Sequence, residues 1–449
     1  MNRIAKRANY LILLFIFFLV CGAIFVNDYR LNVKKWVLHP SNQNIYLNGE
    51  LTTPGTVYSS DGFLLLQIDS QGINYANDPI VRLSTLHVIG DRNDNITTGV
   101  LYSKKSKLIG YDLLNGVFNQ NLNENNQLNL TINAKISTIA YNALGDFNGA
   151  VGIYNYETGE IITMVSKPSF DPMNYIPDIS NEAYEGVFIN RVTNGIYVPG
   201  SIMKLITAYA AIENIDDIYL QSFNCEHGIY IDEEWIQCHD NHGIIDFETA
   251  LSVSCNSAFA IISNQIGSDI LMKYASKAGI NTSYSFNNIN TTRGFFNVSN
   301  SSNVELAWAG IGQYTTMVNP MQFMLFVGSI ANNGILVNPY YIEENRFFNF
   351  GNSNERIISK DSATTLSKLM RNNTISNYGD YRFLNMELSA KTGTAEVEDG
   401  SPHSWFVGFL ANSDTPLAFV IIVENGGNSN TEAINVAETV LHEAIEIFD

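Results

Sequence analysis

Residues 197–212 read YVPGSIMKLITAYAAI, in which a serine stands three positions before a lysine at the head of an apolar run. Pro199-Gly200 predicts a turn, and the residues from Ser201 onward predict a helix. Side chains at positions i and i+3 of a helix face the same way, so Lys204 can reach the Ser201 hydroxyl. A buried lysine with a lowered pKa can activate a serine as a nucleophile. This motif alone also fits a helix-capping serine beside a surface lysine.

Two later stretches favour the chemical interpretation. Residues 252–260, SVSCNSAFA, contain Ser254-Cys255-Asn256, and residues 389–397, SAKTGTAEV, contain Lys391-Thr392-Gly393-Thr394. The chain therefore carries Ser-x-x-Lys, Ser-x-Asn and Lys-Thr-Gly in that order. Together they form the motif set of penicillin-recognising serine acyltransferases.

The chain resembles class B penicillin-binding proteins, which are monofunctional peptidoglycan D,D-transpeptidases. The resemblance covers about residues 145–449. Four further stretches carry it: GAVGIYNYETGEIITMVSKPSFDP (149–172), NRVTNGIYVPGSIMK (190–204), AGIGQYTTMVNPMQFMLFVGSIANNG (309–334) and HSWFVGF (403–409). In the third stretch Tyr314 stands where the family usually has a small residue.

The resemblance implies a role for each residue of the first two motifs. Ser201 would be acylated by a stem peptide ending in D-Ala-D-Ala, with release of the terminal D-alanine. Lys204 would be the general base of that step. Ser254 would pass protons, and Asn256 would bind the substrate amide. An amine of a neighbouring stem peptide would then attack the acyl-enzyme and close a cross-link.

The third motif would bind the substrate. The resemblance implies that Lys391 places positive charge near the substrate carboxylate, and that Thr392 and Thr394 donate hydrogen bonds to it. Gly393 would let the strand approach closely. The backbone N–H groups of Ser201 and Thr394 would form the oxyanion hole.

Hydrophobic periodicity predicts the fold class. Residues 130–145 and 431–448 have helical spacing, whereas 149–172 and 404–425 are strand pairs around polar turns. The last helix carries one apolar stripe: Ala433, Val436, Val440, Ala444 and Ile447. Strands at both ends of a region with helices between them predict an α+β domain whose ends share a sheet. The resemblance implies a β-lactamase-like transpeptidase domain, with a central antiparallel sheet and a helical subdomain.

The N-terminus predicts a membrane anchor. Arg3, Lys6 and Arg7 precede an uncharged apolar run from Ala8 to Asn27, about the length that crosses a bilayer core. A basic N-terminal flank predicts a cytoplasmic stub and an extracytoplasmic body, so the protein would span the cell membrane once. A cleaved signal peptide and a lipoprotein site at Cys21 are the alternatives.

Three domains follow from these patterns. Residues 1–27 form the stub and anchor, 28–144 a small spacer domain, and 145–449 the transpeptidase domain.

Charge and resemblance limit the partners. The chain has 25 Lys and Arg against 44 Asp and Glu, which argues against nucleic acid because phosphate binding needs a basic face. The resemblance implies that stem peptides and β-lactam antibiotics bind at the active site. It also implies a membrane peptidoglycan glycosyltransferase of the shape, elongation, division and sporulation type as a partner in cell-shape or cell-division synthesis.

Other proteins with these motifs remain alternatives. A class D β-lactamase usually has Ser-x-Val in place of Ser254-Cys255-Asn256 and lacks a spacer. A class A β-lactamase needs a deacylating glutamate motif, which is not apparent here, and a bifunctional enzyme needs a glycosyltransferase domain, for which there is no room. A β-lactam sensor usually has more membrane spans. A scaffold that keeps the fold without catalysis is the alternative from another class.

Residues 225–243, CEHGIYIDEEWIQCHDNHG, concentrate metal-ligand types although the predicted chemistry needs no cofactor. Cys225, Cys238 and His242, completed by His239 or Asp240, could form a structural zinc site. A Cys225–Cys238 disulfide is the second interpretation, and unrelated loop residues are the third. The spacing fits no standard zinc-finger pattern.

Overall fold

The computed structural model describes residues 2–43, 45–47, 49–111, 126–174, 176–343, 354–397, 400–412, 414–427 and 431–448. The chain divides into two compact units. The smaller unit comprises Met1–Val57, Leu66–Asn74 and Lys104–Leu128, and the larger one comprises Tyr58–Leu65, Tyr75–Ser103 and Asn129–Asp449. The predicted domain divisions after residues 27 and 144 stay a prediction.

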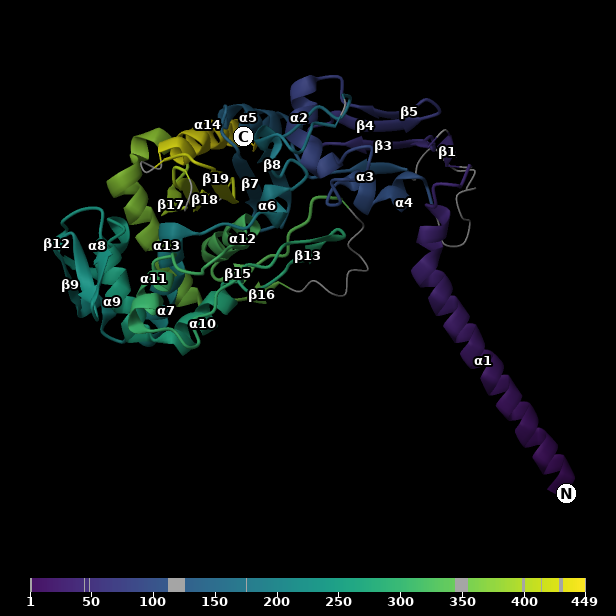
Figure 1. Ribbon diagram of the computed structural model, residues 1–449, viewed down its shortest axis with the longest axis horizontal. Coiled ribbons are helices and arrows are strands. Elements are labelled where there is room, and N and C mark those ends of the chain that lie inside the picture. The colour runs from purple at the N-terminus through teal and green to yellow at the C-terminus, as the bar shows by residue number, and fades with distance from the viewer. Residues whose placement is uncertain are drawn as a thin grey trace. The chain divides into compact units, whose positions relative to one another are not determined.

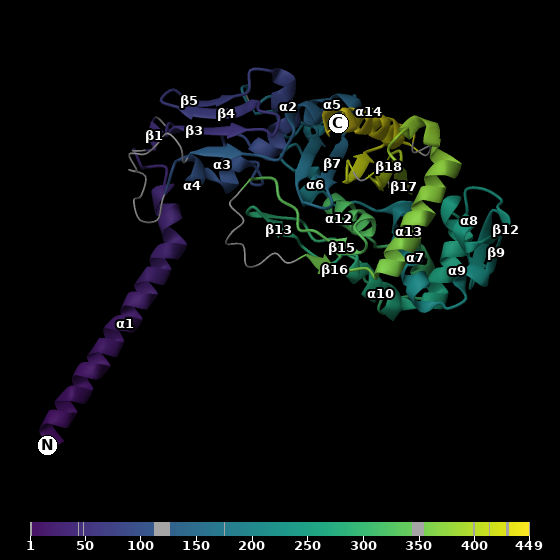
Figure 2. The ribbon, with the colours of Figure 1, turned by 180° about the vertical axis from the view of Figure 1, so that it is seen from behind.

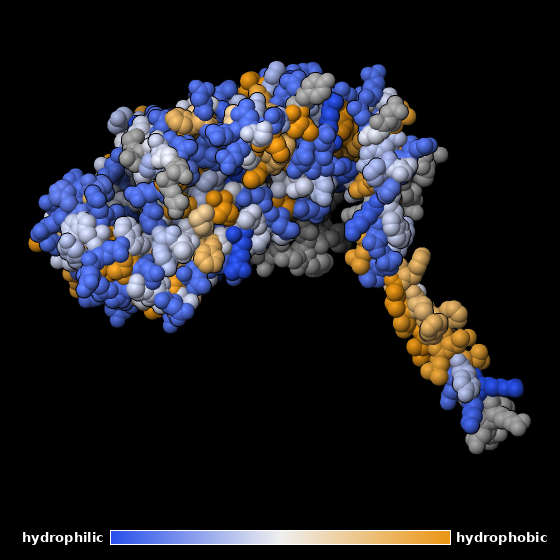
Figure 3. Space-filling model, viewed as in Figure 1, coloured by the Kyte–Doolittle hydropathy of each residue, from blue (hydrophilic) through white to orange (hydrophobic). Residues whose placement is uncertain are grey.

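The first helix, α1 (Asn2–Val37), contains the predicted anchor. Its segment Lys6–Val33 is the one described helix long and apolar enough to cross a membrane. Its side chains from Tyr10 to Val26 are largely exposed, and Figure 3 shows them as a continuous hydrophobic surface. The predicted apolar N-terminal helix is therefore confirmed, and its length and composition fit a membrane anchor.

The part of the chain between α1 and α5 contains short strands and helices. One sheet has the order β5-β4-β3-β6, and β1 pairs with β2 in a small hairpin. The bounds of these elements are β1 Tyr46–Leu47, β2 Glu50–Leu51, β3 Gly55–Tyr58, β4 Leu64–Asp69, β5 Gly72–Tyr75, α2 Pro79–Ile89, α3 Val100–Ser103, α4 Lys105–Leu108 and β6 Gln127–Asn129.

The larger unit is built on a five-stranded antiparallel sheet with the order β17-β18-β19-β7-β8. Its strands are β7 Gly149–Asn155, β8 Ile161–Lys167, β17 Leu388–Ala395, β18 His403–Leu410 and β19 Leu417–Val423. Strand β19 pairs with β7, with Ile421 opposite Val151. The two ends of the domain therefore share one sheet, as the sequence predicts.

Helices cover both faces of this sheet. Helices α5 (Ala134–Ala143) and α14 (Thr431–Phe448) pack on one face, and α12 (Pro320–Ala331) packs on the other (Figure 1). The predicted α14 stripe is buried in the core, with Ile447 at its margin. Because both faces are covered, β19 is buried along its whole length and lacks the alternation of a half-exposed strand.

A helical subdomain lies at the end of the larger unit where Figure 2 shows α8, α9, β9 and β12 together. Strand β9 pairs with β12, and β10 with β11. Besides α12, the described α-helices and strands between β8 and β17 are α6 Arg191–Asn194, α7 Lys204–Asn214, β9 Ser222–Cys225, β10 Gly228–Ile231, β11 Glu234–Gln237, β12 Gly243–Asp246, α8 Phe247–Ser252, α9 Asn256–Ile266, α10 Ser268–Lys277, β13 Ser285–Phe286, β14 Ile289–Asn290, α11 Asn303–Gly310, β15 Ile335–Leu336, β16 Glu355–Arg356 and α13 Lys360–Asn373.

Candidate active site

Ser201 stands in a tight 3₁₀ turn, Gly200–Met203, which leads into α7. Gly200 has a φ of +55°, and a Cβ there would lie 2.1 Å from the Thr394 carbonyl oxygen. Only glycine allows this approach, which brings Ser201 against strand β17. The predicted helix is present, but its α-helical part begins at Lys204 because the nucleophile's own turn is wound more tightly.

Lys204 is fully buried, and its Nζ faces four oxygen atoms. Two of them can only accept hydrogen bonds: the Ser254 carbonyl and Asn256 Oδ1, each 2.6 Å away. The other two are the hydroxyls of Ser201, at 3.1 Å, and Ser254, at 3.2 Å. A neutral amine can donate to the two pure acceptors and turn its lone pair to a hydroxyl. Burial lowers the pKa of Lys204 to about 8, which makes that form accessible near neutral pH.

The second motif forms the turn before α9. Ser254 has a φ of +54°, a conformation that residues with a Cβ seldom adopt and that clusters at functional sites. Its hydroxyl lies 3.1 Å from Lys391 Nζ as well as near Lys204, so it links the two lysines. Asn256 Nδ2 donates to the Gln237 carbonyl at 2.8 Å, which fixes the amide with Oδ1 toward Lys204.

The third motif lies on β17, one of the two edge strands of the five-stranded sheet. Lys391 is buried and donates to the Thr392 carbonyl at 3.0 Å. Burial, reinforced by the charge of Lys204, lowers the pKa of Lys391. A Cβ at Gly393 would lie 2.8 Å from the Pro199 carbonyl oxygen, so this glycine permits the close packing of β17 against the nucleophile's turn.

The three motifs border one cavity of about 840 Å³. Ser201, Ser254, Asn256, Lys391, Thr392 and Thr394 line it. Lys204 lies beneath them, with no exposed surface. Other lining residues belong to none of these motifs: Gln237, Trp308, Ile311, Gln313, Asn377, Tyr378 and Glu396. Ile311 and Gln313 belong to the stretch 309–334 that carries the family resemblance. No local pattern marks Trp308, Asn377 or Tyr378, which only the tertiary structure brings to the cavity.

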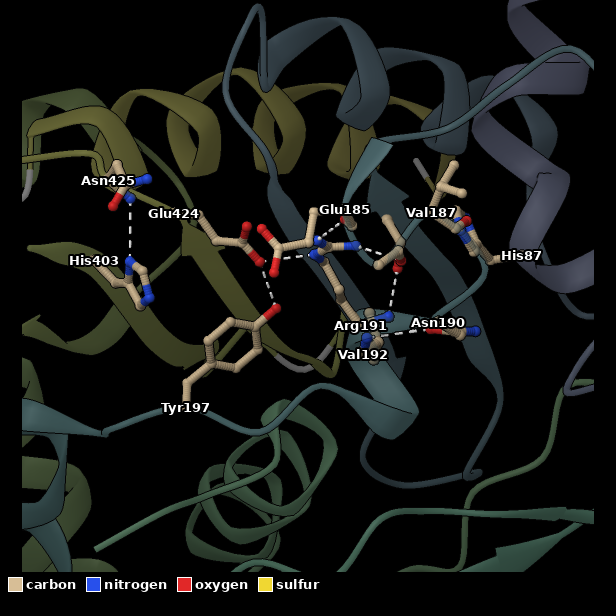
Figure 4. Close-up of polar contacts among 12 residues, drawn as sticks. His87, Glu185, Val187, Asn190, Arg191, Val192, Tyr197, His403, Glu424 and Asn425 are labelled. Atoms are coloured by element: carbon tan, nitrogen blue, oxygen red, sulfur yellow. Dashed lines mark hydrogen bonds and ion pairs between the residues drawn. The ribbon is translucent and has the colours of Figure 1, made fainter. Parts of the chain in front are cut away.

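The segment leading to Ser201 is held by a buried polar network (Figure 4). Tyr197 donates its hydroxyl to Glu424 Oε1 at 2.7 Å, and Arg191 Nε donates to the same oxygen at 2.7 Å. Burial and the Glu424 charge raise the pKa of Tyr197, so this phenol stays protonated. Trp405 donates its indole N–H to the Val198 carbonyl at 3.1 Å. The network thus fixes the residues directly before the nucleophile.

Comparison with known proteins identifies the domain. The penicillin-binding protein transpeptidase domain matches residues 149–446. The chain belongs to the penicillin-binding protein transpeptidase family. It is 24% identical to peptidoglycan D,D-transpeptidase PbpA of Mycolicibacterium smegmatis, in an alignment that covers 95% of each chain. It is also 24% identical to PbpA of Mycobacterium tuberculosis, over 86% of this chain and 79% of that one.

A solved structure confirms the fold. Penicillin-binding protein A from M. tuberculosis, as an imipenem acyl-enzyme complex, superposes with a TM-score of 0.76 at 22% identity. The superposition covers 88% of this chain and 98% of that one. The prediction of a penicillin-binding transpeptidase fold is therefore confirmed.

This penicillin-binding protein also carries a compact cluster of thiols and imidazole. Ligand atoms of Cys225, Cys238, His242 and Cys255 lie within 4.8 Å of one another. His242 Nδ1 is 3.4 Å from Cys225 Sγ and 3.6 Å from Cys238 Sγ. All these cysteines are free thiols in the structure.

The fourth member differs from the one predicted. Cys255, the middle residue of Ser-Cys-Asn, replaces His239 or Asp240, and its Sγ lies 4.0 Å from Cys238 Sγ. His239 Nδ1 comes within 3.9 Å of Cys238 Sγ, yet His239 stays outside the cluster. The sequence analysis drew its candidate ligands from residues 225–243, and Cys255 lies beyond that stretch. Only the tertiary structure brings its thiol next to Cys238.

Proposed function

We propose that this protein is a peptidoglycan D,D-transpeptidase that cross-links stem peptides through an acyl-enzyme on Ser201 and that β-lactams acylate the same residue. The environment of Lys204 carries the proposal. Its amine is buried, its pKa is lowered, and two pure acceptors orient it toward the hydroxyl of Ser201. This is the arrangement that a positioned general base requires.

Acylation would proceed in two steps. Ser201 Oγ attacks the carbonyl carbon of the penultimate D-alanine while Lys204 Nζ accepts the hydroxyl proton. The negative oxygen of the tetrahedral intermediate is stabilised by the backbone N–H groups of Ser201 and Thr394. The C–N bond then breaks, and the leaving amine takes a proton from Lys204 by way of the Ser254 hydroxyl. These steps use only groups of the chain and the substrate, so they need no cofactor.

Transfer of the acyl group to the acceptor amine then uses the same proton path in the opposite direction. A neighbouring stem peptide's amine attacks the ester carbon and loses its proton through Ser254 to Lys204. The ester C–O bond then breaks, and Lys204 gives the proton to the departing Ser201 Oγ. Throughout, Lys391 would supply positive charge near the substrate carboxylate, while Thr392 and Thr394 would donate to it. Asn256 would bind the substrate amide through its side chain.

Labelled benzylpenicillin tests this function on the full chain in detergent. We expect one adduct per molecule on the peptide containing YVPGSIMK, with loss of label over hours rather than seconds. A transpeptidase holds its β-lactam acyl group, so rapid release would instead assign a β-lactamase. Absence of an adduct would assign a scaffold without catalysis.

We also propose a place and a partner for the enzyme. Helix α1 would span the cell membrane once and leave the body outside the cytoplasm. Arg3, Lys6 and Arg7 on the short N-terminal flank of its apolar run support this orientation, and the basic residues after the run precede a large domain, whose translocation depends little on charge. A membrane peptidoglycan glycosyltransferase would supply the strands to be cross-linked, and the anchor and the residues after it would contact that enzyme. Co-purification with the intact anchor, compared with a chain lacking residues 1–27, tests this partnership.

We propose further that Cys225, Cys238, Cys255 and His242 bind one structural zinc ion. A tetrahedral site with Zn–S bonds of about 2.3 Å places its ligand atoms roughly 3.8 Å apart. The separations of 3.4, 3.6 and 4.0 Å in the cluster are on this scale. The Asn256 N–H also donates to Cys238 Sγ at 3.3 Å, so a metal there would stabilise the Ser-Cys-Asn turn.

Elemental analysis of protein purified without chelator should find one equivalent of zinc. A strong chelator should lower the melting temperature by several degrees, because ion binding stabilises only the folded state. Cys255→Ser should lose the metal, whereas Cys21→Ser, which changes the one cysteine outside the cluster, should keep it. Absence of metal together with blocked thiols at 225 and 238 would instead indicate a disulfide.

A further inference from the structure

The hydroxyl of Tyr378 meets the outer edge of β17 within the third motif. Tyr378 ends a π-helical turn, Thr374–Tyr378, that follows α13, and such turns are frequent at functional sites. Side-chain oxygens of the turn accept hydrogen bonds from backbone N–H groups on this edge of β17. Ala390 N donates to Thr374 Oγ1 at 3.2 Å, and Thr392 N donates to the Tyr378 oxygen at 2.9 Å. The turn therefore takes the place of a neighbouring strand.

The hydrogen positions at Tyr378 follow from its neighbours. The Ala390 carbonyl can only accept, so the atom 2.8 Å from it must be Asn373 Nδ2. The same Nδ2 donates to the Tyr378 oxygen at 2.8 Å. With the Thr392 N–H, the phenol oxygen receives two hydrogens. Its own hydrogen is then left for the third neighbour, Thr392 Oγ1, at 3.0 Å.

The Thr392 hydroxyl is thereby fixed as an acceptor toward Tyr378. Its own hydrogen must point elsewhere, and Thr392 lines the active-site cavity. In the described ranges, Tyr378 is the one hydrogen-bond partner of Thr392 Oγ1. The Tyr378 ring is fixed too, because it packs edge-on against Phe406 at a centroid distance of 5.3 Å. Burial raises the pKa of Tyr378, so the phenol keeps the proton that it donates.

We propose that Tyr378 is a positioning residue that holds the Thr392 hydroxyl as a donor toward the cavity. The site then selects a ligand group that only accepts hydrogen bonds, such as a carboxylate, over one that also donates, such as a primary carboxamide. This inference rests on the proposed function, because it assigns a selectivity to the same acylation site. The charge of Lys391 favours a carboxylate as well, and Tyr378 adds to that preference.

The test compares benzylpenicillin with its analogue in which the carboxylate is a primary carboxamide. The readout is the ratio of their second-order acylation rate constants at Ser201. Tyr378→Phe keeps the ring but lets the Thr392 hydroxyl turn, so we expect the ratio to fall roughly 5- to 10-fold, the scale of one hydrogen bond. The loss should appear in the dissociation constant of the non-covalent complex rather than in the limiting acylation rate.

Two controls separate positioning from a general loss of stability. Tyr209→Phe also removes a buried tyrosine hydroxyl, which donates to the Ile357 carbonyl at 2.9 Å outside the cavity, and should leave the ratio unchanged. In a Thr392→Val background, adding Tyr378→Phe should change the ratio no further, because the hydroxyl to be oriented is gone.

The outcomes distinguish this inference from the function on which it rests. An unchanged ratio in Tyr378→Phe, with Ser201 still acylated, would overturn the inference and leave the function standing. If Tyr378→Phe does not fold, Thr392→Val must by itself lower the ratio, and an unchanged ratio there would overturn it equally. Failure of the unaltered protein to be acylated would overturn the proposed function.

Discussion

Ser201→Ala is expected to abolish the covalent penicillin adduct while the protein stays folded. The substitution removes the one atom that forms the ester, so mass spectrometry should find no mass increase on the peptide containing YVPGSIMK. The fold should tolerate the change, because the hydrogen bond recorded for Ser201 Oγ is the one to Lys204, at 3.1 Å. Lys204 keeps its two pure acceptors, so the cost in the free energy of unfolding should be about 1 kcal/mol or less.

The control for this experiment is a thermal melt of both proteins. Melting temperatures that agree within a few degrees, with the adduct lost, would assign the nucleophile to Ser201. An adduct that persists in the alanine variant would contradict the assignment and direct the search to another hydroxyl in the cavity, beginning with Ser254.

Lys204→Ala should slow acylation by roughly 10²–10⁴-fold, the usual scale for a positioned proton acceptor. Lys204→Arg should not restore the rate, because a guanidinium remains protonated and cannot accept the proton. The comparison is made in rapid-mixing acylation experiments with the full chain. Near-normal acylation by the arginine variant would mean that another group takes the Ser201 proton.

The pH profile gives an independent measure of the same role. Lys204 acts as a base only when neutral, and its lowered pKa is about 8. The second-order acylation rate constant should therefore rise with pH, by about tenfold per unit below pH 8, and level off above it. Lys204→Ala should lose this inflection. The Ser254 hydroxyl contacts both Lys204 Nζ and Lys391 Nζ, so the two lysines titrate together. The apparent pKa read from the profile therefore belongs to the pair.

Local patterns were enough to predict much of the fold. The α14 stripe from Ala433 to Ile447 repeats at helical spacing, and the hairpin of β7 and β8 turns at polar residues, so neighbouring residues suffice to predict each. The pairing of β19 with β7 was also predictable in outline, because strands at the two ends of a domain favour a shared sheet. Its register was not, since it depends on packing across the whole core.

The environment of the motifs depended on tertiary contacts. Lys204 meets Asn256 across 52 positions of sequence, and Ser254 meets Lys391 across 137. The order of the motifs predicted that they meet, but not that the Lys204 amine would face two pure acceptors and two hydroxyls. That arrangement comes from the turn at Ser254, which has a positive φ that no sequence pattern predicts.

The sequence by itself therefore determined the long apolar N-terminal helix, the three motifs and the elements that carry them, because these follow from composition, spacing and periodicity along the chain. Only the tertiary structure decided which unmarked side chains join the site. Cys255 completes the thiol cluster and Tyr378 reaches Thr392 because separate elements converge on one cavity. Such convergence depends on how helices and strands pack against one another, and packing is a property of the folded chain as a whole.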